Sequence, residues 1–489
     1  MRILITADHV LAHDGSTHVE LRDGAVIVDD SLISYVGPRA DAPEDGIDER
    51  IELGESLLMP GLIDLDALTD IDHLLIDSWW SSEHSARLQW SAGYFAGERR
   101  HVFSTEERRE VREYALLQLA MHGITSYMPI ASEVHSDWAE SYDDLVAMAE
   151  VSRGIGLRGF LGPSYRSGVN AVTASGTRTV LMDEAEGEAG FADALRFLDH
   201  LAELSDPLLT GVLLPCRIET LTPALLAQTA VAARERGAIV RLHALQGEFE
   251  RGYILENYGH TPLEHIREAG LLAARLIVPH GIFLDVNPRV DGEDNGDLAV
   301  LADNDVSIVH CPLTNVRYGS NLETFTLYRE HGVNLCLGTD SFPPDLIRGI
   351  DAGVQLSKAQ HGDLSRGDLA GYIEAATLGG AAALGRDDLG RIAPGAQADL
   401  TAFRLDDFRM GVTDDPLRTL VLNGTGRDAS LTMVAGAIVM RDGVIPGVDL
   451  AAMRTRGQAL FEKMRAAYTE RDYRGGTNDE LFPPVFPVL

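Results

Sequence analysis

Residues 58–68 of this chain have the sequence Leu58-Met59-Pro60-Gly61-Leu62-Ile63-Asp64-Leu65-Asp66-Ala67-Leu68. The segment is a short apolar run that ends in polar residues, and stretches with helical periodicity alternate with such runs through most of the chain. Eight strands of this kind are expected, and they end near Asp66, Pro129, Pro163, Pro215, His243, His280, Cys311 and Asp340. The helices between them include residues 106–121, 223–236 and 262–269. This alternation predicts an α/β fold, a closed (β/α)8 TIM-type barrel whose functional residues lie at the carboxyl ends of the strands.

Segments with β character flank the barrel on both sides. The first segment has turn signals at Asp14-Gly15 and Asp23-Gly24, and strand-like stretches return after residue 392. Because terminal strands around a barrel most simply pair with each other, we expect residues 1–57 and 393–447 to form one composite β-sandwich module beside a barrel of residues 58–392. Residues 448–489 are expected to form a helix and a Pro-rich tail, which packs on the body or on a second subunit.

Composition limits the classes of partner. The chain has 489 residues, with 41 Lys and Arg against 75 Asp and Glu and a formal net charge of -34. This charge opposes binding to nucleic acid and to anionic membranes. Three widely spaced cysteines without a CxxC pair, and the lack of a signal-like start or an 18-residue apolar run, favour a cytoplasmic protein.

Four groups able to bind metal or transfer protons follow successive predicted strands. His243, His280 and His310 come at the ends of strands 5 to 7, and Asp340 comes at the end of strand 8. A single histidine at a strand end is more often a structural residue. Four such groups at neighbouring strand ends of one barrel, however, indicate a shared site at the barrel mouth.

Several motifs of the chain resemble the chlorohydrolase and aminohydrolase branch of the amidohydrolase superfamily, which includes triazine hydrolases and guanine and cytosine deaminases. They are Met59-Pro60-Gly61-Leu62-Ile63-Asp64, His310-Cys311-Pro312-Leu313-Thr314-Asn315, and residues 332–340, 375–385 and 390–400. The resemblance implies hydrolysis at carbon–nitrogen bonds of small nitrogen-rich substrates, with one divalent ion of zinc, iron or manganese type. It also implies that His243 and Asp340 are metal ligands, and that His280 contacts water or substrate.

Two positions depart from the pattern of this superfamily. Its strand-1 His-x-His pair is replaced by Asp66-Ala67-Leu68, and the side chain of Leu68 cannot coordinate a cation. Its proton-shuttling glutamate, three residues after the strand-5 histidine, is replaced by Gln246, whose carboxamide does not exchange protons near neutral pH. Two alternatives remain. Asp66, His243 and Asp340 still hold one ion with fewer ligands than usual, or the pocket works without metal. Glu248 and Glu250 are near enough in sequence to replace the shuttle.

Other residues are candidates for substrate contacts because they follow barrel strands. Arg166 follows strand 3, Arg217 follows strand 4 together with Glu219, and we expect both arginines, Gln246 and Trp90 to bind substrate. Surface ion pairs and packing against the barrel are the alternatives for these residues. Trp90 belongs to an aromatic group with Trp79, Trp80, Tyr94 and Phe95. Asp70, Asp72 and Asp77 after strand 1 are expected in a solvated loop.

The leading hypothesis is an amidohydrolase-like enzyme of deaminase or amidase type, with Asp340 as general base and His280 and His310 as further catalytic groups. The second hypothesis is a metal-independent acid-base enzyme that catalyses imine-forming cyclisation, cyclodehydration or elimination, which the altered strand-1 pair and Gln246 favour. The third hypothesis is a non-catalytic ligand-binding homologue. Homodimerisation is expected from chain size and from the resemblance.

Overall fold

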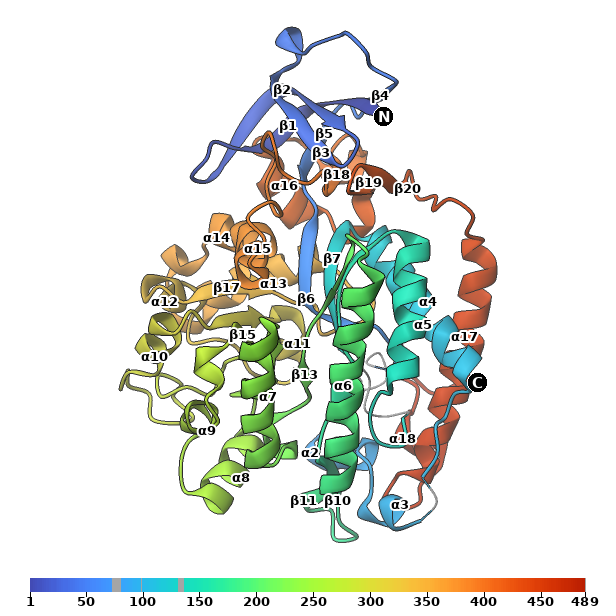
Figure 1. Ribbon diagram of the computed structural model, residues 1–489, viewed down its shortest axis with the longest axis vertical. Coiled ribbons are helices and arrows are strands. Elements are labelled where there is room, and N and C mark those ends of the chain that lie inside the picture. Colours follow the sequence, from blue (N-terminus) through green and yellow to red (C-terminus); the bar gives the residue numbers. More distant parts are fainter. Residues whose placement is uncertain (73–80, 98, 131–135, 489) are drawn as a thin grey trace.

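The computed structural model describes residues 1–72, 81–97, 99–130 and 136–488. Figure 1 shows a barrel surrounded by helices, with a β module at the end that holds the N-terminus. The strands of the barrel are β6 (Leu62–Leu68), β7 (Ile124–Ile130), β8 (Arg158–Leu161), β12 (Leu209–Gly211), β14 (Val240–Arg241), β15 (Leu276–Pro279), β16 (Ser307–His310) and β17 (Asn334–Leu337). They end within about three residues of the predicted positions when β13 (Leu214–Pro215), which continues β12, is included.

Backbone hydrogen bonds close these strands into a barrel. Strands β6, β7, β8 and β12 form one parallel sheet, and strands β14 to β17 form another. The amide of Asp340 donates to the carbonyl of Asp66 over 2.9 Å, and the amide of Leu213 donates to the carbonyl of Ile239 over 2.9 Å. These bonds join the two sheets at both edges, so the predicted (β/α)8 fold is confirmed.

Helices follow the strands as the periodicity predicts, and their first residues carry typical caps. Ser104 and Thr261 form capping boxes, and Thr222 caps a helix that begins with Pro223. The helices around the barrel are α4 (Thr105–Met121), α5 (Tyr142–Ile155), α6 (Glu184–Leu204), α7 (Pro223–Arg236), α8 (Glu248–Tyr258), α9 (Pro262–Glu268), α10 (Asp297–Asp303), α11 (Pro312–Arg317), α12 (Phe325–Glu330), α13 (Leu346–His361), α14 (Leu369–Glu374) and α15 (Gly380–Leu384). Helices α4, α7 and α9 confirm the three helices named from the sequence.

The β module combines strands from both ends of the chain. Its strand order is β20-β19-β18-β5-β1-β2-β3, with β4 beside β1. The strands are β1 (Arg2–His13), β2 (His18–Asp29), β3 (Leu32–Pro38), β4 (Glu49–Glu52), β5 (Ser56–Pro60), β18 (Leu400–Arg404), β19 (Ala429–Val434) and β20 (Ala437–Arg441). The turn expected at Asp23-Gly24 is wrong, because both residues lie inside β2 and only Asp23 takes a left-handed conformation, at φ 46°. The domain boundaries stay a prediction.

A buried ion pair fastens the β module to the barrel. Arg158, on β8, donates from Nε to Oδ2 of Asp399 over 2.7 Å and from Nη2 to Oδ1 over 3.0 Å. The two side chains are only 2% and 4% exposed. Asp399 also accepts the amide of Ala435, and its own carbonyl accepts the amide of Gly61 just before β6. The pair therefore fixes the start of the first barrel strand against the module.

The C-terminal segment packs on the body of the same chain. Helix α17 (Leu450–Ala467) lies along α4, and Tyr468 is buried beside Met464 in the cluster beneath it. Figure 1 shows α17 running along the side of the barrel, with α18 (Asn478–Leu481) after it. Val485 and Phe486 near the end stay exposed. Within the described part of the chain, no helix has the length and apolarity needed to cross a membrane.

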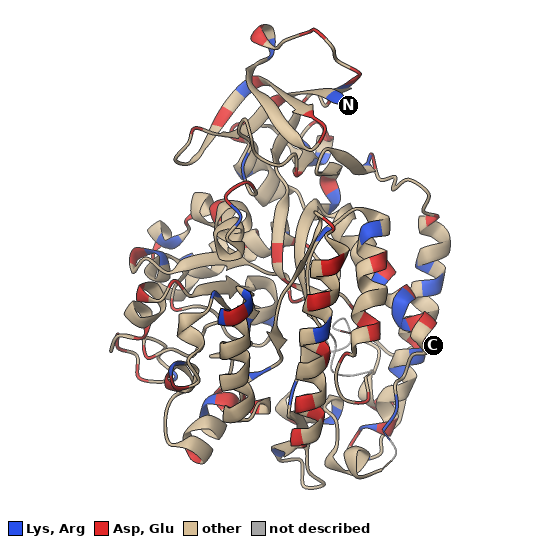
Figure 2. Ribbon diagram, viewed as in Figure 1, with Lys and Arg blue, Asp and Glu red and all other residues tan. Residues whose placement is uncertain are grey.

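Acidic residues are frequent on several of the outer helices. Figure 2 marks acidic positions along the helices visible in this view. Helix α6 has six acidic residues and one arginine. Solvated charges of this kind keep the surface repulsive toward polyanions, as the composition predicts.

We expect Asp399→Asn to destabilise the protein by about 3–5 kcal/mol, because it leaves the buried Arg158 guanidinium without its counter-charge. Urea unfolding followed by circular dichroism measures this loss. The matched control is Asp442→Asn, which breaks a half-exposed pair with Arg404 in the same module and should cost less than about 1 kcal/mol. Equal losses in the two variants would contradict the role given to the buried pair.

Candidate functional site

Four of the predicted groups meet at the carboxyl end of the barrel. Nε2 of His243 lies 3.3 Å from Oδ1 of Asp66, and Nε2 of His280 lies 3.9 Å from Oδ2 of the same carboxylate. Nε2 of His280 also lies 3.7 Å from Oδ2 of Asp340. All four residues are buried. Asp66, His243 and His280 offer ligand atoms that lie within 4.8 Å of one another.

The backbone at these strand ends is adapted to bring the side chains together. Gly338 lies where a Cβ atom would come within 2.5 Å of Cβ of Asp66, so only glycine lets β17 approach β6 this closely. His280 and Asp340 have left-handed backbones, with φ values of 71° and 39°. Such conformations are strained for residues other than glycine, and they occur frequently at functional sites.

Asn315 fixes the orientation of His280. The contact between Nδ1 of His280 and Oδ1 of Asn315 is 2.8 Å, so Nδ1 carries the proton and donates it to the amide oxygen. In this tautomer Nε2 of His280 presents a lone pair toward Asp66 and Asp340. Nε2 of His280 accepts no hydrogen bond within the part of the chain that the structure describes. The lone pair of this nitrogen is therefore available to a ligand.

His310 lies behind this group and not in it. Its Nδ1 is 3.5 Å from Nδ2 of Asn315, and its ring packs against Phe325 and Tyr372. His310 is fully buried, and burial lowers its pKa to about 3. The structure thus places this predicted catalytic residue one contact away from the reacting groups, where it supports Asn315.

Burial and a fixed cation set the charges of the site. Burial lowers the pKa of His280 to about 3, so this imidazole is neutral at ordinary pH. Burial alone would raise the pKa of Asp66, but His243, Arg241 and His280 together hold it below its usual range. Nη1 of Arg241 lies 3.4 Å from Oδ1 of Asp66. Asp66 is therefore ionised and already has one permanent positive neighbour.

The donor set fits a divalent metal ion of the kind that the resemblance implies. Two imidazoles and one carboxylate form a three-ligand set that catalytic zinc accepts, and Nε2 of His280 is an orphaned buried nitrogen directed at the same point. Leu68 lies beyond Asp66 on the cavity wall and supplies nothing to an ion. Sγ of Cys311 lies 3.7 Å from Oδ2 of Asp66, and burial raises the pKa of this thiol, which is therefore neutral.

A cavity of about 780 Å³ opens beside this group; His243 and Asp340 line it, whereas Asp66 and His280 are buried and do not. Of the predicted substrate contacts, Trp90, Arg217 and Gln246 line its wall, whereas Arg166 does not. Arg166 is buried behind Trp90, with its guanidinium carbon 5.5 Å from the centre of that ring and 5.9 Å from the ring of Trp138. It supports the aromatic wall from behind.

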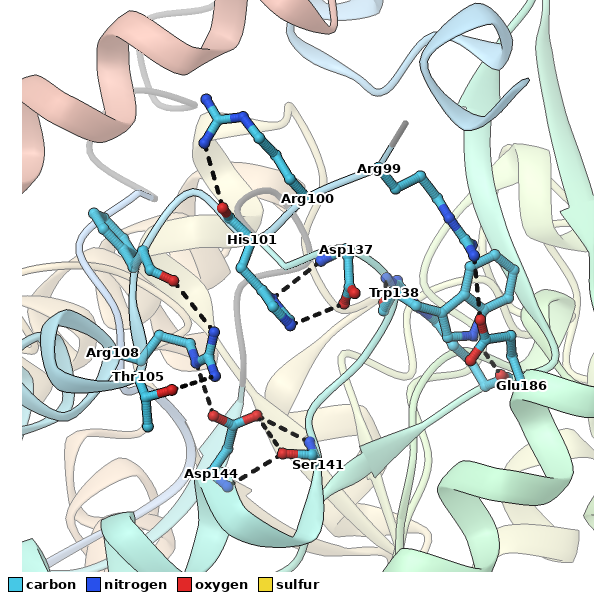
Figure 3. A network of polar contacts seen from close by, with 12 residues as sticks. Arg99, Arg100, His101, Thr105, Arg108, Asp137, Trp138, Ser141, Asp144 and Glu186 are labelled. Carbon is cyan, nitrogen blue, oxygen red and sulfur yellow. Dashed lines mark hydrogen bonds and ion pairs between the residues drawn. The ribbon is translucent and has the colours of Figure 1, made fainter. Parts of the chain in front are cut away.

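The aromatic wall is held by a network of charged side chains. Trp90 stacks on Phe95 at 4.6 Å between ring centres, and Phe95 meets Trp138 edge to face. Figure 3 shows Arg99 reaching Glu186 beside Trp138; its guanidinium carbon lies 5.1 Å from the centre of that ring. In the same network His101 pairs with Asp137, and Arg108 pairs with Asp144. The predicted members Trp79 and Trp80 lie outside the described residues.

Neither acidic residue after Gln246 replaces the missing proton shuttle. The carboxamide of Gln246 accepts a hydrogen bond from Arg217, as its chemistry allows. Glu248 is exposed and pairs with Arg289 over 3.0 Å. Glu250 turns back and accepts the amides of Leu245 and Gln246, at 2.6 and 3.0 Å. Both glutamates line the cavity, but their carboxylates are engaged elsewhere.

The acidic segment after strand 1 is not solvated. Asp70 and Asp72 are 0% and 2% exposed, so the expectation of a surface loop is wrong for both, while Asp77 lies outside the described residues. The carboxylate of Asp70 lies 3.8 Å from the buried guanidinium of Arg112. Arg112 also donates to the carbonyl of Thr69 over 2.6 Å. Arg112, a buried cation from α4, therefore compensates the charge of Asp70.

Sequence reasoning missed two residues of the site. Arg241 precedes His243 by two positions in one strand, and residues two apart in a strand point to the same face, so the signal was present. Asn315 lies in α11, and only the fold shows that this helix directs it at both His280 and His310.

The sequence profile described as "Amidohydrolase family" matches residues 57–439. A 5-methylthioadenosine/S-adenosylhomocysteine deaminase of Halobacterium salinarum is 27% identical and aligns over 91% of this chain and 94% of its own length. An 8-oxoguanine deaminase of Pseudomonas aeruginosa is 24% identical, over 91% of this chain and 95% of its own.

Solved structures share the fold. An adenosine deaminase from Xanthomonas campestris with bound zinc superposes with a TM-score of 0.76 at 23% identity, over 95% of this chain and 98% of that one. An atrazine chlorohydrolase from Arthrobacter aurescens complexed with zinc gives a TM-score of 0.73 at 21% identity, over 94% and 100%. At these identities the likeness concerns the fold.

We expect the stability of the protein to fall between about pH 5 and pH 8 through Glu250. Burial and the neighbouring Glu219 raise the pKa of Glu250 from 4.5 to about 8, so the folded state binds a proton that the unfolded state has released. Glu250→Gln should therefore gain stability relative to wild type as pH rises, by on the order of 1–3 kcal/mol over this range. Urea unfolding at several pH values measures the difference. Glu248→Gln, at an exposed carboxylate, should show none.

Proposed function

This chain belongs to the amidohydrolase family, and we propose that it is a hydrolase that removes an amino group from a nitrogen-containing ring of a small substrate. The observation that carries the proposal is the convergence of Asp66, His243, His280 and Asp340 next to a substrate-sized cavity, which His243 and Asp340 line. The relatives named above as deaminases support the reaction class. We do not propose the non-catalytic alternative, because a cavity with four convergent buried polar groups serves no structural purpose.

In this proposal Asp66, His243 and His280 would hold one divalent ion of zinc, iron or manganese type. Such an ion would supply Lewis acidity at the barrel mouth. The assignment differs from the expectation that Asp340 is a ligand, since the three atoms that lie closest together come from the other residues. Asn315 supports it, because its amide oxygen keeps the proton of His280 on Nδ1 and leaves Nε2 available.

Asp340 is the proposed general base. Its side chain lines the cavity, with Oδ2 3.7 Å from Nε2 of His280, so a water that enters the cavity and contacts this carboxylate can lose a proton to it. The oxygen of that water adds to the ring carbon, and the same proton passes to the departing nitrogen as the carbon–nitrogen bond breaks and ammonia leaves. Gln246 cannot share this transfer. We therefore assign both proton steps to Asp340, and a positioning role to His310.

A second candidate function is a metal-independent acid-base reaction, such as cyclodehydration or elimination. The specific observation in its favour is Arg241, whose guanidinium lies 3.4 Å from Asp66 and supplies a fixed positive charge at the site. Leu68 and Gln246 also favour this function, since they stand in place of a metal-binding histidine and a proton-shuttling glutamate that metal-dependent hydrolysis uses. Homodimerisation stays a prediction under both functions.

We expect ammonia release from 5-methylthioadenosine, S-adenosylhomocysteine or 8-oxoguanine when the protein is supplied with zinc, manganese or iron. A coupled ammonia assay and the ultraviolet spectrum of the ring measure the reaction. Asp340→Asn should lower kcat by about 10²–10⁴-fold, because the proposed base is lost. Glu248→Gln is the matched control and should keep its activity. A spectral change without ammonia would reject deamination in favour of the second function.

We expect Arg241→Met to bind zinc more tightly than wild type, because the guanidinium no longer competes for Asp66. Without metal the variant should unfold at a lower temperature, and added zinc should raise that temperature by more than it does for wild type. Thermal unfolding with and without zinc measures both effects. Arg289→Met, at the rim of the cavity, is the control. No zinc-dependent gain in either protein would support the metal-independent function.

A further inference from the structure

A second polar group lies on the cavity wall, beside the metal-ligating set but not part of it. It is built on the short helix η2 (Ile218–Thr220) and on β10 (Gly168–Val172). The amide of Ile218 donates to the carbonyl of His243 over 3.0 Å, so η2 is fastened to the strand end that carries this histidine. Glu219 and Asn170 both line the cavity next to it.

Two hydrogen-bond acceptors of this group receive no donor from the described residues. Oε1 of Glu219 accepts the side-chain amide of Asn170 over 2.9 Å. Oε2 of Glu219 receives no hydrogen bond from any described residue, although the residue is only 4% exposed, and the same holds for Oδ1 of Asn170. Buried acceptors are nearly always satisfied in folded proteins, so two neighbouring open ones on a cavity wall indicate a ligand that brings donors.

The carboxyl group of Glu219 has a second carboxyl group, that of Glu250, as its neighbour, and the raised pKa of Glu250 keeps this neighbour protonated near pH 7. Glu250 packs behind Glu219, and the proximity of the two carboxyl groups contributes to the raised pKa of Glu250. Arg217 is the cation nearest to this pair, and its guanidinium donates to Gln246. Arg178, on β11 (Arg178–Met182), faces the same cavity, with its guanidinium carbon 4.3 Å from the centre of the Phe249 ring. No contact between Arg178 and Glu219 is present in the described structure.

We propose that Glu219 and Asn170 form a subsite for a cationic nitrogen donor of the substrate, an ammonium or amidinium group. This inference rests on the proposed function, because it concerns the substrate that the Asp66, His243 and His280 site transforms. An amidinium carries several N–H donors and a positive charge, which suit two acceptors without partners among the described residues, Oε2 of Glu219 and Oδ1 of Asn170. A carboxylate or phosphate would offer only acceptors to acceptors, and Glu219 would repel it.

The subsite also gives a reason for keeping Glu219 buried. Removing a carboxylate from water is unfavourable unless charge or hydrogen bonds compensate it. Here the hydrogen bond from the side-chain amide of Asn170 compensates Glu219 in part. A bound cation would complete the compensation. Binding of the substrate would therefore complete the charge compensation of Glu219. Because η2 is fastened to the strand end of His243, the cationic end of the substrate would lie beside this histidine.

Three probes of similar shape test the proposal on the full-length protein: benzamidine as the cation, benzamide as the neutral analogue and benzoate as the anion. Isothermal titration calorimetry measures their binding without any turnover. We expect benzamidine to bind at least about tenfold more tightly than benzamide, and benzoate to bind most weakly. Equal affinities, or a preference for benzoate, would overturn the subsite with no variant needed.

Two variants test whether Glu219 and Asn170 bind the cationic group of benzamidine. Glu219→Gln, which keeps the shape of the side chain, should lower benzamidine affinity by about tenfold or more and leave benzamide affinity nearly unchanged. Asn170→Ala should lower it by a smaller factor. Glu248→Gln is the control, since this carboxylate lines the same cavity but pairs with Arg289. Circular dichroism and thermal unfolding verify that each variant is folded.

Asp340→Asn separates this inference from the proposed function. If both hold, this variant loses turnover and still prefers benzamidine. Preference for benzamidine in a protein that releases no ammonia from any substrate would reject the deaminase proposal and keep the subsite. Ammonia release with no difference between Glu219→Gln and wild type toward benzamidine would reject the subsite and keep the deaminase.

Discussion

The hydrogen bond from the amide of Asp340 to the carbonyl of Asp66 closes the barrel between its first and last strands. The same bond sets the separation of the two carboxylates that the site uses, because each belongs to one of the bonded residues. Gly338 makes the approach sterically feasible, and the left-handed backbone of Asp340 turns its side chain into the mouth. Barrel closure and site geometry are thus one constraint, and a change that loosens this seam alters both.

Closure also creates an electrostatic problem, which the surrounding residues solve in part. It buries Asp66 beside the lone pair of His280, with Asp340 on the other side. Arg241 supplies one positive charge from the floor of the barrel, and Asn315 fixes the imidazole so that its proton points away from the carboxylates. These groups do not fully compensate the negative potential at the mouth of the barrel. The remaining potential attracts a cation or a proton donor, and this attraction underlies both functions considered for the protein.

Segments outside the barrel define the wall of the cavity. Trp90 follows α2 (Ser82–Leu88), and the amide of Ser91 donates to the carbonyl of Arg471 from the C-terminal segment over 2.9 Å. Arg87 of α2 pairs with Asp472 over 2.8 Å, and the guanidinium of Arg471 stacks on Trp90. The tail beyond the family match at residue 439 therefore braces the wall against which substrate would lie.

The sequence by itself determined the barrel, its strand ends and the gathering of His243, His280 and Asp340, because these features follow from local periodicity and from the rule that parallel strands end at one face. It could not decide their partners. Contacts between residues far apart in the chain decide that His310 lies behind Asn315, that Gln246 pairs with Arg217 and that Asp70 is buried against Arg112. Burial and distance set the charge and the role of each group, and only the tertiary structure fixes both.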